Sequence, residues 1–206
     1  MKRHVQDPFV RQAQREGQVS RSFYKLEQMD QRHNLLSKRS VVVDLGAAPG
    51  GWTSYVAKRL AEGSTLVAID LLPLDPVVVK QVTEAAIDCH VLQGDFRSTD
   101  VQEKMRSILK DKKVSLVLSD MAANTIGDSQ ADALRTMGLC ETALDMAMEL
   151  LCEQGVFVAK YFSCSDEVEL RNHARQYFDK VQVVKPPASR KESAERYLMA
   201  KGYHGL

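Results

Sequence analysis

The chain has 206 residues, of which 44% are hydrophobic and 27% charged, and its net charge is +1. This length indicates one domain, large enough to bury a sizeable core. No apolar run approaches the ~20 residues of a membrane span, and the N-terminus, residues 1–4, lacks the apolar core of a signal peptide. We therefore expect a soluble protein with no membrane partner, cytoplasmic in a bacterium or mitochondrial in a eukaryotic host.

The expected elements alternate between helices and strands along the chain. Only about ten residues join the last two strands, too few for a crossover helix, so the last strand should be antiparallel. The pattern predicts an α/β fold with a doubly wound, mostly parallel sheet. Strands are expected at residues 41–45, 65–70, 89–93, 114–119, 155–160, 180–184 and 195–201, and helices at 21–34, 52–61, 76–86, 99–110, 130–152 and 166–178.

The most informative segment is the glycine-rich turn at residues 44–52, DLGAAPGGW, which follows the first of these strands. Glycines there let the backbone approach a ligand closely. Asp70 closes the next strand, where a carboxylate can bind the two hydroxyls of a ribose. Pro49 has no N–H and interrupts the spacing of dinucleotide-binding turns, so a cofactor without a pyrophosphate is favoured. S-adenosylmethionine is such a cofactor.

Three further polar residues end strands at the same expected edge of the sheet. Asp95 follows the third strand and could accept a hydrogen bond from an adenine amino group. Asp120 and Lys160 end the fourth and fifth strands, and a lysine there is costly to bury unless a carboxylate pairs with it. The pair is either part of a catalytic site or a structural ion pair at the sheet edge.

The remaining reactive residue types give weaker signals. The four cysteines include no C-x-x-C pair and lie in or beside apolar segments, which indicates buried, reduced thiols. The five histidines lack the spacing of metal ligands, so no metal site is expected.

Charge is distributed unevenly along the chain. Residues 1–39 hold nine Lys and Arg against four Asp and Glu, and residues 180–202 hold six against two, whereas the middle is acidic. The two basic ends could form a platform for a polyanion such as RNA, or they could simply be solvated faces.

Several motifs together resemble the FtsJ/RrmJ (RlmE) family of ribosomal RNA 2′-O-ribose methyltransferases, and the resemblance extends from about residue 7 to 205. It implies the class I methyltransferase sheet, with seven strands in the order 3-2-1-4-5-7-6. One departure is Ala123, where the family usually has proline, and this loosens the loop after Asp120. The motifs are SRSFYKL at 20–26, the turn at 44–52, DLLP at 70–73, QGDF at 93–96, SDMA at 119–122 and KPPASRKESAE at 185–195.

The resemblance also assigns roles to individual residues. The family's catalytic tetrad maps onto Lys25, Asp120, Lys160 and Glu195, with Lys160 expected to receive or share the proton of a ribose 2′-hydroxyl. Two lysines paired with two carboxylates keep such a site near neutral, which makes burial tolerable. The residues expected to bind S-adenosylmethionine are Gly46, Gly50, Trp52, Asp70, Asp95 and Asp120.

The implied substrate is a ribose of large-subunit ribosomal RNA, with a uridine as the expected target, and the protein is expected to be a monomer. Two alternatives remain: a tRNA 2′-O-ribose methyltransferase, or a non-catalytic ribosome-assembly factor that keeps the cofactor fold. We expect a single methyltransferase domain over residues 1–206, with residues 1–39 as a basic N-terminal helical extension. The candidate phosphate contacts are Lys2, Arg3, Arg11, Arg15, Arg21, Arg190 and Lys191.

Overall fold

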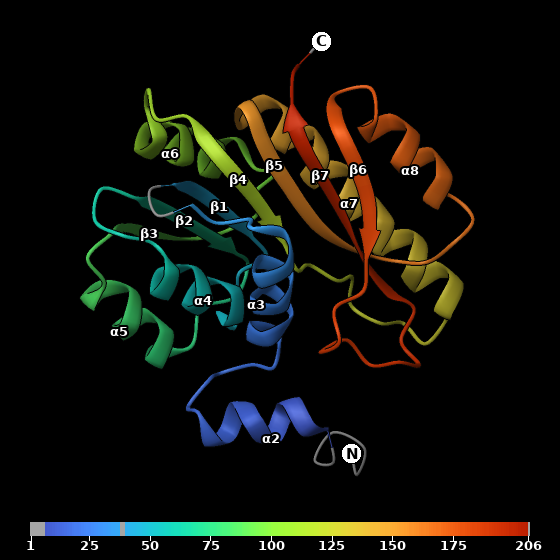
Figure 1. Ribbon diagram of the computed structural model, residues 1–206, viewed down its shortest axis with the longest axis horizontal. Helices are drawn as coiled ribbons and strands as arrows, with labels where there is room; N and C mark the ends of the chain where they lie inside the picture. Colours follow the sequence, from blue (N-terminus) through green and yellow to red (C-terminus); the bar gives the residue numbers. More distant parts are fainter. Residues whose placement is uncertain (1–6, 38–39, 206) are drawn as a thin grey trace.

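The computed structural model describes residues 7–37 and 40–205, and its centre is a seven-stranded sheet (Figure 1). The strand order is β3-β2-β1-β4-β5-β7-β6, and β7 is antiparallel to both of its neighbours. The predicted fold, strand order and reversed last strand are therefore confirmed. The strands are β1 (Val41–Leu45), β2 (Thr65–Asp70), β3 (Asp88–Gln93), β4 (Val114–Ser119), β5 (Leu151–Phe162), β6 (Phe178–Val184) and β7 (Glu195–Tyr203).

Helices cover both faces of the sheet, as the alternation of elements predicts (Figure 1). Neighbouring residues of one strand point to opposite faces, so Val42 packs with the layer of α3, α4 and α5, and Val43 packs with the layer of α6, α7 and α8. The helices are α2 (Pro8–Arg15), α3 (Ser22–His33), α4 (Gly51–Arg59), α5 (Pro76–Glu84), α6 (Thr99–Leu109), α7 (Ser129–Leu150) and α8 (Glu167–Ala174). No helix in residues 7–37 and 40–205 is long and apolar enough to cross a membrane.

The predicted boundaries were wrong at two junctions in the C-terminal half, between α7 and β5 and between α8 and β6. The helix expected to reach residue 152 ends at Leu150, and β5 starts at once at Leu151, because an irregular register pairs Val114 with Leu151 and Leu116 with Val156. The helix expected to reach residue 178 ends at Ala174. Phe178 instead begins β6, where its ring packs against Tyr203 at a centroid distance of 5.2 Å.

The N-terminal segment contains two helices rather than one. The pattern at residues 21–34 predicted α3, whose Phe23, Leu26 and Met29 are buried in the core. The preceding helix, α2, starts with a proline, and the carboxylate of Asp7 accepts a hydrogen bond from the Phe9 amide at 3.0 Å as its N-cap. Figure 1 shows α2 beyond the end of α3, at the carboxyl-end edge of the sheet.

Candidate active site

The glycine turn connects β1 to α4 and requires glycine at two positions. Gly46 and Gly50 have φ angles of 73° and 115°, which residues other than glycine rarely adopt. A Cβ at Gly46 would lie 2.1 Å from Met121 Cγ, and one at Gly50 would lie 2.7 Å from Val78 Cγ1. The turn therefore packs closely against the loop after β4 on one side and against α5 on the other.

Beside this turn is a cavity of about 490 Å³, which we call the turn cavity, and its volume is in the range of ligand-binding pockets. Of the residues predicted to bind a cofactor, Gly46, Asp70, Asp95 and Asp120 line it. Gly50 and Trp52 are buried and are not part of its described lining. The Trp52 ring instead packs against Tyr197, and its indole N–H donates to the Ser22 carbonyl at 2.9 Å.

Two carboxylates of the turn cavity hold its walls in place. Asp70 accepts hydrogen bonds from the Ala48 amide at 2.9 Å and the Leu72 amide at 2.8 Å, so it ties the glycine turn to the loop after β2. Asp95 forms a bidentate ion pair with Arg97, whose hydrogen bonds hold the pKa of the carboxyl below its usual value. Asp95 is thus held as an anion at the edge of the cavity, and Asp70 is held in place by two backbone amides.

The charges in the turn cavity suit a cationic nucleoside. Asp70, Asp95 and Asp120 line it, whereas Arg97 is the one cation in its described lining. A sulfonium nucleoside such as S-adenosylmethionine is positively charged and fits these carboxylates. A pyrophosphate-containing cofactor is itself an anion and fits them less well.

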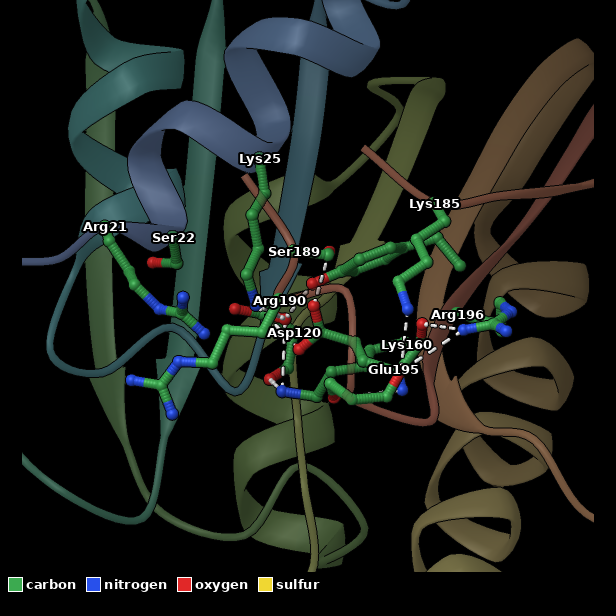
Figure 2. A network of polar contacts seen from close by, with 12 residues as sticks. Arg21, Ser22, Lys25, Asp120, Lys160, Lys185, Ser189, Arg190, Glu195 and Arg196 are labelled. Atoms are coloured by element: carbon green, nitrogen blue, oxygen red, sulfur yellow. Dashed lines mark hydrogen bonds and ion pairs between the residues drawn. The ribbon is translucent and has the colours of Figure 1, made fainter. Parts of the chain in front are cut away.

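Four charged residues from different elements meet beside the turn cavity. Figure 2 shows Lys25 of α3 reaching toward Asp120, which follows β4, and toward Glu195, the first residue of β7. Lys25 Nζ lies 2.7 Å from Glu195 Oε2 and 4.0 Å from Asp120 Oδ1. Lys160 Nζ, from β5, lies 3.1 Å from Asp120 Oδ1 and also donates to the Asp120 carbonyl. The structure therefore brings the predicted tetrad together in one cluster, which we call the catalytic cluster after its predicted role.

The ionisation of the catalytic cluster follows from these contacts. Burial favours the neutral form of Asp120, but the positive charges of Lys160 and Lys25 outweigh it, so the pKa of Asp120 lies below its ordinary value. The carboxylate is therefore ionised at neutral pH. Within the cluster, the Nζ of each lysine lies within 3.1 Å of a carboxyl oxygen.

Two residues of the cluster were not predicted from the sequence. The buried Tyr197 hydroxyl donates to Asp120 Oδ1 at 2.8 Å, and its ring lies 5.7 Å from Lys25 Nζ. Tyr197 faces the same side of β7 as Glu195, two residues earlier, so strand alternation could have found it. The buried Ser189 hydroxyl donates to Glu195 Oε1 at 2.6 Å. Ser189 lies in the KPPASRKESAE motif at residues 185–195, but the motif gave it no role of its own; it reaches the site from the loop between β6 and β7.

The loop after Asp120 is also tied down, contrary to the expected effect of Ala123. The Ala123 amide donates to the Thr136 hydroxyl at 3.2 Å, and Thr136 lies buried on α7. Proline has no N–H and could not make this bond. The departure from the family pattern thus adds an anchor for the loop.

Some of the candidate RNA-contacting residues are exposed, and others form ion pairs within the protein. Lys2 and Arg3 lie outside the described residues. Arg11, Arg15 and Lys191 are exposed. Arg21 and Arg190 both form ion pairs with Asp7, and the Arg190 Nε lies 3.2 Å from its Oδ2.

The four cysteines are free, as predicted, although Cys140 alone is buried and the others are half-buried. No group of histidine, cysteine and carboxylate side chains in residues 7–37 and 40–205 could hold a metal ion.

The sheet order with its reversed last strand, and the charged cluster beside a nucleoside-sized cavity, are those of Rossmann-like methyltransferases. The family model for FtsJ-like methyltransferases matches residues 18–203. The chain belongs to the FtsJ-like methyltransferase family.

Full-length relatives agree with this membership. The chain is 44% identical to ribosomal RNA large subunit methyltransferase E of Novosphingobium aromaticivorans, over 100% of this chain and 87% of the relative. Identity to the protein of the same name from Marinobacter nauticus is 41%, over 98% and 94% of the two chains. A crystal structure described as a ribosomal RNA methyltransferase from Plasmodium falciparum superposes with a TM-score of 0.77 at 26% identity, covering 91% of this chain and 99% of that one.

Proposed function

We propose that this protein transfers a methyl group from S-adenosylmethionine to the 2′-hydroxyl of a ribose in large-subunit ribosomal RNA, with a uridine as the target. It acts as a single methyltransferase domain in the bacterial cytoplasm. The observation that carries the proposal is the catalytic cluster, in which Lys160 and Asp120 stand beside the turn cavity. The names of the full-length relatives support ribosomal RNA as the substrate.

The turn cavity supplies the residues for the cofactor. Asp70 would bind the ribose hydroxyls, Asp95 the adenine amino group, and Asp120 would face the positive charge. Gly46 and Gly50 serve by keeping the turn free of side chains, and Trp52 serves by packing against Tyr197. When bound, S-adenosylmethionine supplies a methyl group activated by the positive charge on sulfur.

Lys160 is the group placed to receive or share the proton of the ribose 2′-hydroxyl. A ribose hydroxyl is a poor nucleophile while protonated, and removing its proton during the reaction strengthens the attack. Lys160 accepts the proton as a neutral amine, and Asp120 holds its Nζ in a defined position through its carboxylate and its carbonyl. The in-line geometry that methyl transfer needs then comes from fixed groups rather than from a mobile side chain.

Lys25 and Glu195 complete the arrangement. Lys25, bound to Glu195 at 2.7 Å, is placed to orient the 2′-oxygen or the adjacent phosphate. Glu195 pairs with Lys25, so that Lys25 can lie buried near Lys160 without an unpaired charge. Ser189 fixes the other oxygen of Glu195.

Transfer of radiolabelled methyl groups tests the proposed substrate. The purified protein is incubated with labelled S-adenosylmethionine and either large ribosomal particles from cells that lack this enzyme or bulk tRNA. We expect label in the large-subunit RNA, at one nucleotide whose 2′-oxygen resists alkaline cleavage. Label in tRNA alone would establish the tRNA alternative. Cofactor binding without transfer to either RNA would favour the non-catalytic assembly factor.

A further inference from the structure

A second cavity, of about 540 Å³, lies between the start of α7, the carboxyl end of β5 and the residues that precede β7. It adjoins the catalytic cluster. Phe162 lines the cavity and is the cross-strand partner of Glu195. Ala194 also lines it, directly precedes Glu195, and accepts a hydrogen bond from the Ser163 amide at 3.0 Å.

A single loop separates this second cavity from the turn cavity. Asn124 lines the turn cavity and the next residue, Thr125, lines the second cavity. The loop is anchored to α7, because the Ile126 amide donates to Asp132 Oδ1 at 2.9 Å and the Arg135 guanidinium donates to the Asn124 carbonyl at 3.0 Å. The two cavities are thus neighbouring compartments divided by a fixed wall.

The lining of the second cavity suits a neutral, flat, hydrogen-bonding group. Phe162 offers an aromatic ring, Asp132 a mostly buried carboxylate, and the described lining contains no lysine or arginine. A phosphate would meet the carboxylate without a compensating cation. A base can instead stack on the ring and donate its N–H groups to oxygens. Ser163 and Ser165 already donate to carboxylates and Ser193 accepts from the Glu195 amide, so these hydroxyls would meet a base with their remaining lone pairs. The hydroxyl groups of the lining are those of Thr125, Ser129, Ser163, Ser165 and Ser193.

Basic side chains stand at the margin of the second cavity rather than inside it. Lys185 Nζ donates to the carbonyl of Ser193, a lining residue, at 2.7 Å. Arg196 donates to the Glu195 carbonyl at 2.9 Å, and Figure 2 shows both basic groups on the same side of the catalytic cluster. Cations at the margin and a carboxylate inside match the polarity of a nucleotide whose base enters while its phosphates stay outside.

We propose that the second cavity binds an unpaired nucleobase of the RNA substrate, and that this base is the one beside the reacting ribose. This inference rests on the proposed function, since it takes an RNA to be the methyl acceptor. Holding the base would fix the ribose over the catalytic cluster and give the enzyme a preference for a target that can leave its base stack. Such a preference is separate from the salt-dependent attraction of the phosphate backbone.

Blocking the second cavity tests the inference. Ser165 is exposed and lines the second cavity, whereas Ser107 is also exposed, on α6, and lines neither the second cavity nor the turn cavity. We expect Ser165→Trp to raise the concentration of ribosomal particles needed for half-maximal single-turnover methylation by about tenfold or more, the size of one lost base-stacking contact. Ser107→Trp should need the same concentration of particles as the wild type. Both variants should bind S-adenosylmethionine with wild-type affinity.

The salt dependence of particle binding separates a base from a phosphate. Base contacts release no counterions, so Ser165→Trp should bind more weakly with the same log–log salt slope as the wild type. A shallower slope would show that the cavity region contacts phosphates, which would overturn the inference.

Alkylation of Cys164 gives a readout that does not depend on activity. Cys164 is a free, half-buried thiol in the lining, and Cys89 and Cys152 are half-buried thiols elsewhere. Saturating ribosomal particles should slow the reaction of Cys164 with iodoacetamide at least severalfold relative to the other two, as peptide mass spectrometry would show.

The outcomes distinguish the inference from the proposed function. Particles that are methylated while Cys164 reacts as fast as in the free protein would overturn the inference alone, and so would a Ser165→Trp variant that behaves like Ser107→Trp. Failure of the wild type to methylate particles would instead overturn the proposed function.

Discussion

Ser189 and Lys25 each engage one oxygen of Glu195, at 2.6 and 2.7 Å. Removing the serine hydroxyl leaves Glu195 free to rotate, and with it Lys25. We expect Ser189→Ala to lower the single-turnover rate of methyl transfer by about tenfold, the size of one buried hydrogen bond to a charged group, with cofactor affinity unchanged. Ser189→Thr, which keeps a hydroxyl, should restore most of the rate. An alanine variant at full rate, or a threonine variant as slow as alanine, would remove Ser189 from a positioning role.

Asp70 can be tested through the cofactor alone. Its carboxylate supports both the glycine turn and the loop after β2, and it lines the turn cavity. Asp70→Ala should weaken binding of S-adenosylmethionine by about 1–3 kcal/mol, since it leaves the ribose hydroxyls of the bound cofactor without their acceptor. Isothermal calorimetry measures this directly, with Asp111→Ala at an exposed position as control. Unchanged affinity would exclude Asp70 from the binding site.

Asp44 gives the fold a pH dependence of its own. Burial raises the pKa of Asp44 to about 7, well above the 3.8 of a free aspartate, so the folded state holds a proton that the unfolded state releases. Its effect on stability is therefore favourable at low pH and is lost as pH rises from about 4 to above 7.

The prediction concerns the midpoint of thermal unfolding. Between pH 5 and pH 8 the wild type should lose more stability than Asp44→Asn, which stays neutral and can still accept the Thr53 hydrogen bond. Asp111→Asn, at an exposed position, serves as control and should follow the wild type. If the unfolding midpoints of Asp44→Asn and the wild type changed by the same amount between pH 5 and pH 8, Asp44 would be shown to ionise normally.

At the scale of elements, Asp7 joins three parts of the chain. It caps α2, pairs with Arg21 at the start of α3, and pairs with Arg190 on the loop that carries Ser189. Asp7→Asn keeps the helix cap but loses the charge, whereas Asp7→Ala loses both. We expect both variants to speed hydrogen exchange in residues 185–194, and only Asp7→Ala to speed it strongly in α2 as well. Equal protection of residues 185–194 in all three proteins would contradict this linkage.

The fold was more predictable than the site for a physical reason. Buried parallel strands appear as local apolar runs, so β1, β2 and β4 were predicted with their observed bounds. Asp120 and Lys160 were predicted because residues that end neighbouring parallel strands meet at one edge. The start of β5 was missed because an irregular pairing with β4 decides it.

The position of Lys25 came from the family resemblance, and Ser189 was missed altogether. Lys25 reaches Glu195 across 170 residues of sequence, and Ser189 reaches it through the conformation of a loop. Local sequence patterns do not contain that information. The pairing of Arg21 and Arg190 with Asp7 is a contact of the same long-range kind.

At the scale of the whole molecule, the exposed basic residues of α2 and of the loop between β6 and β7 remain our candidates for phosphate contacts. Arg15 and Lys191 are exposed, so their charge can be reversed without breaking the Asp7 network. Arg15→Glu combined with Lys191→Glu should make the log–log salt slope of particle binding shallower by about 1.4 to 1.8, for two lost phosphate contacts. Lys80→Glu with Arg106→Glu, on α5 and α6, is the matched control. An unchanged slope in the first pair would place the RNA elsewhere.

The most direct test of the catalytic cluster is a single-turnover measurement on three Lys160 enzymes with saturating S-adenosylmethionine and ribosomal particles. Lys160→Ala removes the group that receives the proton, and Lys160→Arg keeps a cation beside Asp120 that does not give up its proton at neutral pH. Both variants should bind the cofactor within a few-fold of the wild type and transfer methyl groups at least about a hundredfold more slowly, the scale of a general-base contribution. Lys80→Ala, at an exposed position, should be fully active. A Lys160→Ala enzyme with a near-normal rate would contradict the assignment of Lys160 as the proton acceptor.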